Sequence, residues 1–189
     1  SFQATLRPFA SLRFFRIRMK NPVYLDNNAT TALDERVLEA MLPFLKGMYG
    51  NAASSTHSYG WQAAEAVKIA REQVASLIGA TPEEIVFTSG ATEADNLALK
   101  GVAEAYASKG DHIVTVATEH KAVLDTCKWL EKTGRRVAYI GVDGDGLIDL
   151  SELEAAITPQ TVLVSVMMAN NETGVLQPMA TISEIVHRK

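Results

Sequence analysis

From residue 85 onward, short apolar segments alternate with segments whose apolar residues recur at helical spacing. The apolar segments, at 85–88, 112–116, 137–140 and 162–168, have the length of strands, and the last is nearly continuous in apolar residues. Such a strand is typical of a parallel sheet buried on both faces. Alternating strands and helices place helices on both sides of one sheet. We therefore expect an α/β fold, a three-layer α/β/α arrangement around a mostly parallel sheet.

The intervening helices follow from apolar spacing and from glycines that close helices. We expect helices over roughly 61–78, 92–108, 121–132 and 150–157, and a last helix that begins near Thr181. The predicted inward faces are Ala63, Val67, Ala70, Val74 and Leu77 in the first helix, and Leu97, Ala98, Val102 and Tyr106 in the second.

The N-terminal region carries weaker signals. We expect a short strand at 23–25, and a helix that is capped by Asp34 and carries apolar residues at helical spacing. Residues 1–18 hold four arginines and no acid, which is typical of an organellar transit segment but also of a cloning remnant. Met19 is a natural start. We therefore treat 1–18 as an extension and 19–189 as one α/β domain.

Composition excludes several classes of protein. Without the four arginines of 1–18, 14 basic and 22 acidic side chains remain, a balance of −8, which argues against nucleic acid as the main partner. No apolar run approaches the roughly 20 residues of a membrane span, so we expect no membrane association. The single cysteine, Cys127, fits a reducing compartment and hence a cytoplasmic protein, or an organellar one if 1–18 is a transit segment. Cys127 falls mid-helix among apolar residues, so we expect a core or boundary residue rather than a nucleophile.

Small residues, Ser89 and Gly90, stand where the predicted strand 85–88 gives way to a helix. They leave the free N–H groups of the helix's first turn open to a ligand, and these groups together with the helix dipole bind anions such as phosphate. Small residues at strand–helix turns are also common without any ligand.

Two further polar clusters follow predicted strand ends: Glu119-His120 and Asn170-Asn171. Ligands gather beyond the carboxyl ends of parallel strands, so these clusters should converge on the anion site. An imidazole at His120 can stack on a flat ring and move protons near neutral pH, although histidines at strand ends are often only hydrogen-bonded. Asn171 offers a donor and an acceptor, while Asn170 is equally suited to be the turn residue.

Residues 141–152 have most of the spacing of a calcium-binding EF-hand loop, with acids at loop positions 3, 5, 9 and 12 and glycine at position 6. Position 1, however, is Gly141, and a strand rather than a helix precedes it. We therefore expect no metal here, but a turn followed by a helix that Asp149 or Ser151 caps. The glycine-rich patterns of dinucleotide and P-loop sites are absent from the sequence.

Five ordered motifs resemble the NifS/IscS-type cysteine desulfurases, pyridoxal-phosphate (PLP) enzymes of the class V aminotransferase group. The motifs are Tyr24-Leu25-Asp26-Asn27-Asn28-Ala29-Thr30-Thr31, Gly50-Asn51 with Ser54 and His57, Phe87-Thr88-Ser89-Gly90-Ala91-Thr92-Glu93, Thr118-Glu119-His120-Lys121-Ala122-Val123, and Asn170-Asn171-Glu172-Thr173-Gly174. The resemblance covers 22–189. It departs from the family at Ala52, where proline is common.

The resemblance implies roles for particular residues. Ala91 and Thr92 match the pair that binds the PLP phosphate, His120 matches the histidine that stacks on the pyridine ring and assists proton transfer, and Asn171 matches the asparagine near the ring oxygen and the substrate carboxylate. No metal ligand is implied.

The implied reaction removes sulfur from L-cysteine, leaving L-alanine and an enzyme persulfide that feeds iron–sulfur cluster assembly. The resemblance further implies a homodimer and a sulfur acceptor such as an iron–sulfur scaffold. It covers only the N-terminal half of a fold-type I PLP enzyme, without the Schiff-base lysine or the persulfide cysteine, so this chain alone should be inactive. A selenocysteine lyase or another class V enzyme, and a non-catalytic module that binds sulfur-transfer partners, remain alternatives.

Overall fold

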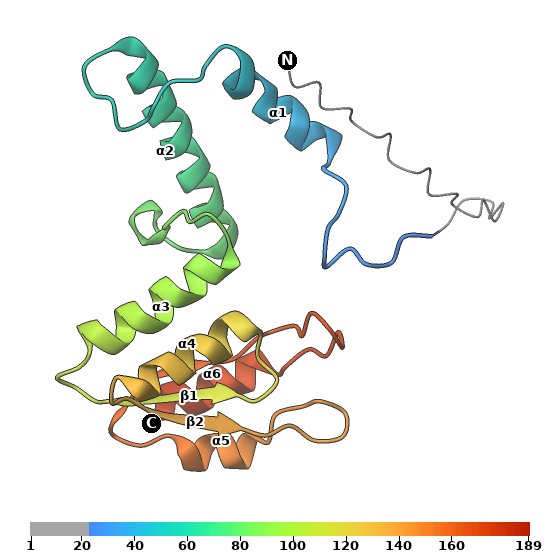
Figure 1. The fold of residues 1–189 in the computed structure, drawn as a ribbon, viewed down its shortest axis with the longest axis vertical. Coiled ribbons are helices and arrows are strands. Elements are labelled where there is room, and N and C mark those ends of the chain that lie inside the picture. Colours follow the sequence, from blue (N-terminus) through green and yellow to red (C-terminus); the bar gives the residue numbers. More distant parts are fainter. Residues whose placement is uncertain (1–22) are drawn as a thin grey trace, which may run out of the picture. The chain divides into compact units, whose positions relative to one another are not determined.

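The computed structural model describes residues 23–189 (Figure 1), so the prediction for residues 1–18 lies outside them. The elements of the described part are, in chain order, α1 (Glu35–Lys46), α2 (Ser58–Ile78), the 3-10 helix η1 (Pro82–Glu84), α3 (Ala91–Ala105), β1 (His112–Val116), α4 (Lys121–Lys132), β2 (Arg136–Ile140), α5 (Leu150–Ala156), β3 (Thr161–Ser165) and α6 (Met179–Arg188). The chain divides into two units between Leu42 and Pro43, within α1.

The described part of the first unit contains no strand. The strand predicted at 23–25 is wrong: those residues are followed by a turn, in which the Ala29 N–H donates to the Asp26 carbonyl (3.2 Å). A lone extended segment has no neighbour to receive its backbone hydrogen bonds. The helix predicted after Asp34 is confirmed, since the Asp34 carboxylate accepts the Arg36 N–H at 2.8 Å and so caps the first turn of α1.

Helix α2 begins three residues earlier than predicted, because His57 caps it by accepting the Gly60 N–H on Nδ1 (3.2 Å). Gly79 ends the helix at φ 72°, as predicted for a left-handed closing residue. Its predicted inward face is only partly correct. Ala63 is buried, but Val67, Val74 and Leu77 are exposed. Periodicity marks an apolar stripe, while burial also requires a neighbour to cover it.

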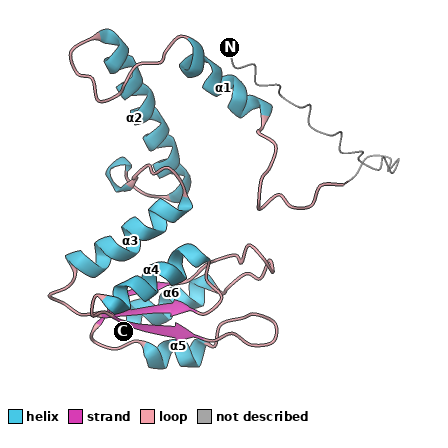
Figure 2. Cartoon of the chain, viewed as in Figure 1, coloured by secondary structure: helices cyan, strands magenta, loops and turns pink. Residues whose placement is uncertain are grey.

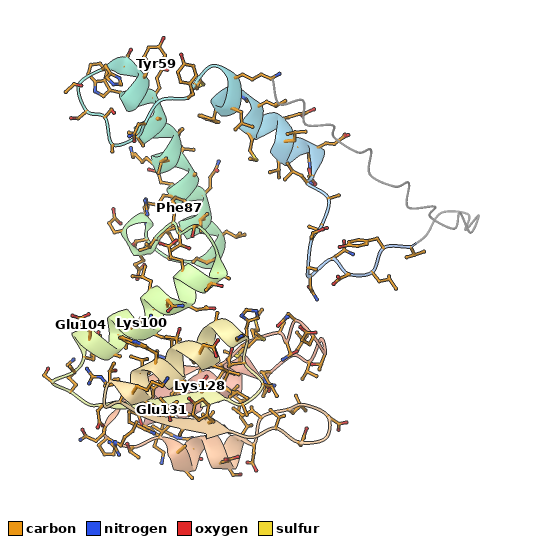
Figure 3. The ribbon with its side chains drawn as sticks, in the orientation of Figure 1. Tyr59, Phe87, Lys100, Glu104, Lys128 and Glu131 are labelled. Carbon is orange, nitrogen blue, oxygen red and sulfur yellow. The ribbon has the colours of Figure 1, made fainter. Side chains whose placement is uncertain are left out.

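The strand predicted at 85–88 is likewise wrong. These residues pair with no strand of the described part. Arg71 of α2 holds the segment instead: its guanidinium donates to the Ile85 carbonyl and lies 5.0 Å from the ring centroid of Phe87, which Figure 3 labels. The chain therefore enters α3 from a tethered loop.

The three strands of the described part form one parallel sheet in the order β2-β1-β3. Strands are coloured magenta in Figure 2. β1 pairs with β2 over its whole length, from His112–Arg136 to Val116–Ile140, and with β3 as far as Thr115–Ser165. The bounds of β1 and α4 agree with the prediction, whereas β3 is three residues shorter at its carboxyl end. The expected α/β class with a parallel sheet between helices is confirmed.

Alternate residues of β1 enter two cores on opposite faces of the sheet. Ile113 packs with Leu99 and Ala103 of α3 and with Cys127 of α4. Val114 and Val116 pack on the other face, with Ile140, Ile148, Leu153 and Ile182. Accordingly, α4 and α5 lie on opposite sides of the sheet (Figure 1).

The inward face of α3 differs from the one predicted. Leu99 and Ala103 are its buried residues, whereas Leu97 and Tyr106 are 52% and 44% exposed. Because α3 carries apolar residues on more than one side, its spacing alone does not select the side that meets the sheet.

Candidate functional site

The first turn of α3 offers unused backbone donors. Within residues 23–189, the N–H groups of Ala91 and Thr92 make no hydrogen bond, as expected for the start of a helix. The donors of Ser89, which precedes them in the chain, are already bound. The Glu93 carboxylate accepts the Ser89 N–H at 2.7 Å and the Ser89 hydroxyl at 2.6 Å. These hydrogen bonds lower the pKa of Glu93. The Ala91 and Thr92 amides remain available to an anion.

His120 lies just beyond the carboxyl end of β1 and caps α4. Its Nδ1 accepts the Ala122 N–H at 3.1 Å, so the local role expected of a strand-end histidine is present. Because Nδ1 is the acceptor, the proton of the neutral ring sits on Nε2. The cap therefore fixes the ring and leaves Nε2 to meet a ligand.

Thr92 and His120 line the same open hollow of about 380 Å³ between α3 and α4. The other lining residues are Asn96, Lys100, Lys121, Ala122, Asp125, Thr126 and Trp129. The predicted approach of Thr92 and His120 is thus present, although a loop rather than a strand leads into α3. Ala91, the residue before Thr92, begins α3 and is not among the residues that line the hollow.

Most of these lining residues were not predicted from the sequence. Thr92, Asn96 and Lys100 recur every four residues on α3, and so do Lys121, Asp125 and Trp129 on α4, so each set is one helical stripe. The stripes are visible in the sequence, but their facing is a tertiary fact. Lys100, labelled in Figure 3, joins them: its Nζ lies 4.6 Å from the ring centroid of Trp129.

The loop after β3 shows which asparagine is the turn residue. Asn170 accepts the Glu172 and Thr173 N–H groups on Oδ1 and donates Nδ2 to the Thr118 carbonyl at 3.0 Å. Asn171 is exposed and donates to the Glu172 carboxylate at 3.3 Å. It does not line the hollow of Thr92 and His120. Asn170 therefore ties the loop carrying Asn171 to the loop carrying His120.

Two other candidates have structural roles. Asp143 accepts the Asp145 and Leu147 N–H groups, both at 2.9 Å, and Asp149 caps α5, so the EF-hand-like segment is the expected turn and capped helix. No group of metal-ligating side chains occurs in residues 23–189. Cys127 is fully buried, and burial raises the pKa of its thiol to about 11. Among residues 23–189, none of the helices combines the length and the apolar content of a membrane span.

The chain matches a known protein family. The family model of class-V aminotransferases matches residues 23–189, nearly the whole chain. The chain belongs to the class-V aminotransferase family. The matched range includes every residue that lines the hollow.

Within the class-V aminotransferases, the relatives include cysteine desulfurases. The chain is 60% identical over 173 residues to cysteine desulfurase IscS of Proteus mirabilis, covering 90% of this chain and 43% of that protein. A solved NifS-like protein superposes with a TM-score of 0.84 at 47% identity, over 88% of this chain and 46% of its own. A structure of SspA in complex with cysteine gives 0.81 at 39% identity, over 87% and 47%. The chain thus spans less than half the length of these proteins.

Proposed function

We propose that this chain supplies the phosphate-binding and ring-stacking part of a PLP-dependent cysteine desulfurase, which takes sulfur from L-cysteine and leaves L-alanine and an enzyme persulfide. The observation that carries the proposal is that Thr92, at the N-terminus of α3, and His120, at the start of α4, line one hollow. The high identity to proteins named cysteine desulfurase supports the reaction, and the SspA structure supports cysteine as the substrate.

The residues present fit PLP on their own chemistry. A phosphate group needs several N–H donors and little steric obstruction, and the Ala91 and Thr92 amides satisfy the first need. Gly90 satisfies the second, since a Cβ added there would meet nothing within 4 Å. The Thr92 hydroxyl adds a side-chain donor. These residues would hold the phosphate.

His120 would meet the cofactor ring and move a proton at Nε2, because the Ala122 amide occupies Nδ1. Asn171 would orient the ring oxygen or the substrate carboxylate with its amide. When bound, PLP supplies an electron sink for the substrate's reacting carbon. The chain's own contribution is to bind the phosphate, orient the ring and hold the proton.

Partners follow from the same proposal. The sulfur leaves as a persulfide, so an iron–sulfur scaffold or another sulfur acceptor must receive it. We propose a homodimer in the cytoplasm for the complete protein. Selenocysteine would enter the same site, so both amino acids belong in one assay.

The test uses the full-length gene product loaded with PLP. His120→Ala should lower alanine release from L-cysteine about 100-fold or more, the usual worth of a positioned general acid–base. His187→Ala is the matched control, since His187 is exposed on α6 and outside the hollow. A wild-type protein that binds PLP but releases neither alanine nor sulfide from cysteine would overturn the desulfurase proposal. Faster turnover of selenocysteine would replace it with a lyase.

A further inference from the structure

The carboxyl ends of β1 and β3 are joined beyond the point where the strands stop pairing. The backbone ladder between them ends at Thr115–Ser165. Two residues later, the Met167 N–H would have no partner from β1, because the chain turns away at Ala117. The carboxylate of Glu119 accepts it instead. A side chain thus replaces the next rung of the ladder.

A second bond spans the same junction. The Asn170 side-chain amide donates to the Thr118 carbonyl at 3.0 Å. Two consecutive residues of the loop after β1, Thr118 and Glu119, therefore hold two residues of the loop after β3. The first loop continues into His120 and the second into Asn171, which are 51 residues apart in the sequence.

A carboxylate is unusual at position 119, since Glu119 is only 8% exposed. Burying a charge is costly unless hydrogen bonds or partial charges compensate it. Burial raises the pKa of Glu119, while the backbone N–H groups of Met167 and His120 act in the opposite direction. Its position at the N-terminus of α4 also favours a negative charge. Packing alone would be better served by an apolar residue here.

The surroundings place this carboxylate against the site rather than in the core. Glu119 and His120 line a hollow of about 180 Å³ with Asp95, Val123 and residues 165–167. His120 also lines the larger hollow of Thr92. A change in the Glu119 tether would thus move the wall that carries the histidine.

We propose that Glu119 is a positioning residue that fixes the loop carrying His120 to the loop carrying Asn171. The expected effect on catalysis rests on the proposed PLP site. The tether itself, the hydrogen bond from the Met167 N–H to the Glu119 carboxylate, does not depend on that proposal. The Met167 N–H needs an acceptor at the reach of a glutamate side chain, so an amide of equal length replaces the carboxylate and a shorter carboxylate does not.

The experiment compares Glu119→Gln, Glu119→Ala and Glu119→Asp in the full-length protein, with and without PLP. Backbone hydrogen exchange is followed by mass spectrometry in peptides covering 117–120 and 166–174. Ala and Asp should each speed exchange in both segments about tenfold, the effect of losing one hydrogen bond to a charged group. Gln should stay within about twofold of wild type, and kcat for cysteine should follow the same order with KM less affected.

Glu152→Ala is the matched control, because the Glu152 carboxylate accepts the Gly141 N–H (3.3 Å) just beyond β2, and β1 lies between β2 and β3. It should speed exchange near 141 and leave 166–174 unchanged. Unchanged exchange at 166–174 in Ala and Asp, or a Gln variant that exchanges as fast as Ala, would overturn the tether. If Glu119→Ala does not fold, the comparison of Glu119→Asp with Glu119→Gln still tests the tether. A tether that is confirmed in a protein without desulfurase activity would remove the proposed function alone.

Discussion

The protonation of Glu119 ties one residue to the stability of the fold. Burial raises its pKa above the ordinary 4.5, with Asp95 acting in the same direction and His120 against it. The folded state therefore binds this proton more tightly than the unfolded state. Its contribution to stability is complete below the unfolded pKa, is lost as pH rises through the folded pKa, and is constant above it.

Glu119→Gln should remove this pH dependence. The free energy of unfolding of wild type minus that of the variant should fall as pH rises from about 4 to 7, and urea titrations at stepped pH measure it. A difference that stays constant, or rises with pH, would show that the folded state does not favour the proton.

The thiol of Cys127 should be inert in the folded protein. Burial raises its pKa to about 11, and the charges of Glu131 and Glu119 act in the same direction. Only about one thiol in a thousand is then ionised at pH 8, and the thiolate is the reactive form. Peptide mapping after treatment with iodoacetamide should find Cys127 unmodified until urea is added. Rapid modification in the native protein would contradict the burial.

At the scale of elements, the cap of α5 distinguishes two interpretations of the acidic segment 141–152, a turn followed by a capped helix and a metal-binding loop. Asp149 accepts the Ser151 and Glu152 N–H groups at 2.8 and 3.1 Å. Asp149→Ala should lower the free energy of unfolding by about 1 kcal/mol, while Asp149→Asn, an equally good cap, should lower it little. Calcium should leave the Tm unchanged. A rise of Tm with calcium that Asp149→Asn abolishes would restore the metal loop.

At the scale of the molecule, much apolar surface of the second unit is exposed. Leu77, Ile78 and Val86 are 84%, 65% and 65% exposed. Exposed apolar patches bind partners or hydrophobic dyes. The 189-residue chain should therefore bind the dye ANS and self-associate.

Leu77→Gln should reduce dye binding without loss of stability, whereas Leu153→Gln, at a fully buried position, should unfold the chain. Size-exclusion chromatography and urea titration separate the two effects. A monomer that binds no dye would contradict the exposure.

The α/β fold class and the bounds of β1 and α4 could be predicted, because the residue types within these two elements themselves indicate which residues are buried. Ile113 and Val114 enter opposite cores, so every residue of β1 has to be compatible with burial and the whole strand is visible as one run. The meeting of Thr92 and His120 was expected from the gathering of parallel strand ends at one edge. That rule applies to His120, which follows β1, but not to Thr92, because residues 85–88 before α3 form a loop.

The sequence by itself determined where apolar runs, caps and strand-end polar clusters lie, because these depend on neighbours along the chain. Tertiary structure alone decided which runs became strands, since 23–25 and 85–88 lack a paired neighbour in the described part, and a strand needs one for its backbone hydrogen bonds. It also decided which side of α2 and α3 is buried. Finally, it gave Glu119 its role, because the acceptor and the Met167 N–H are 48 residues apart and meet only in the folded sheet.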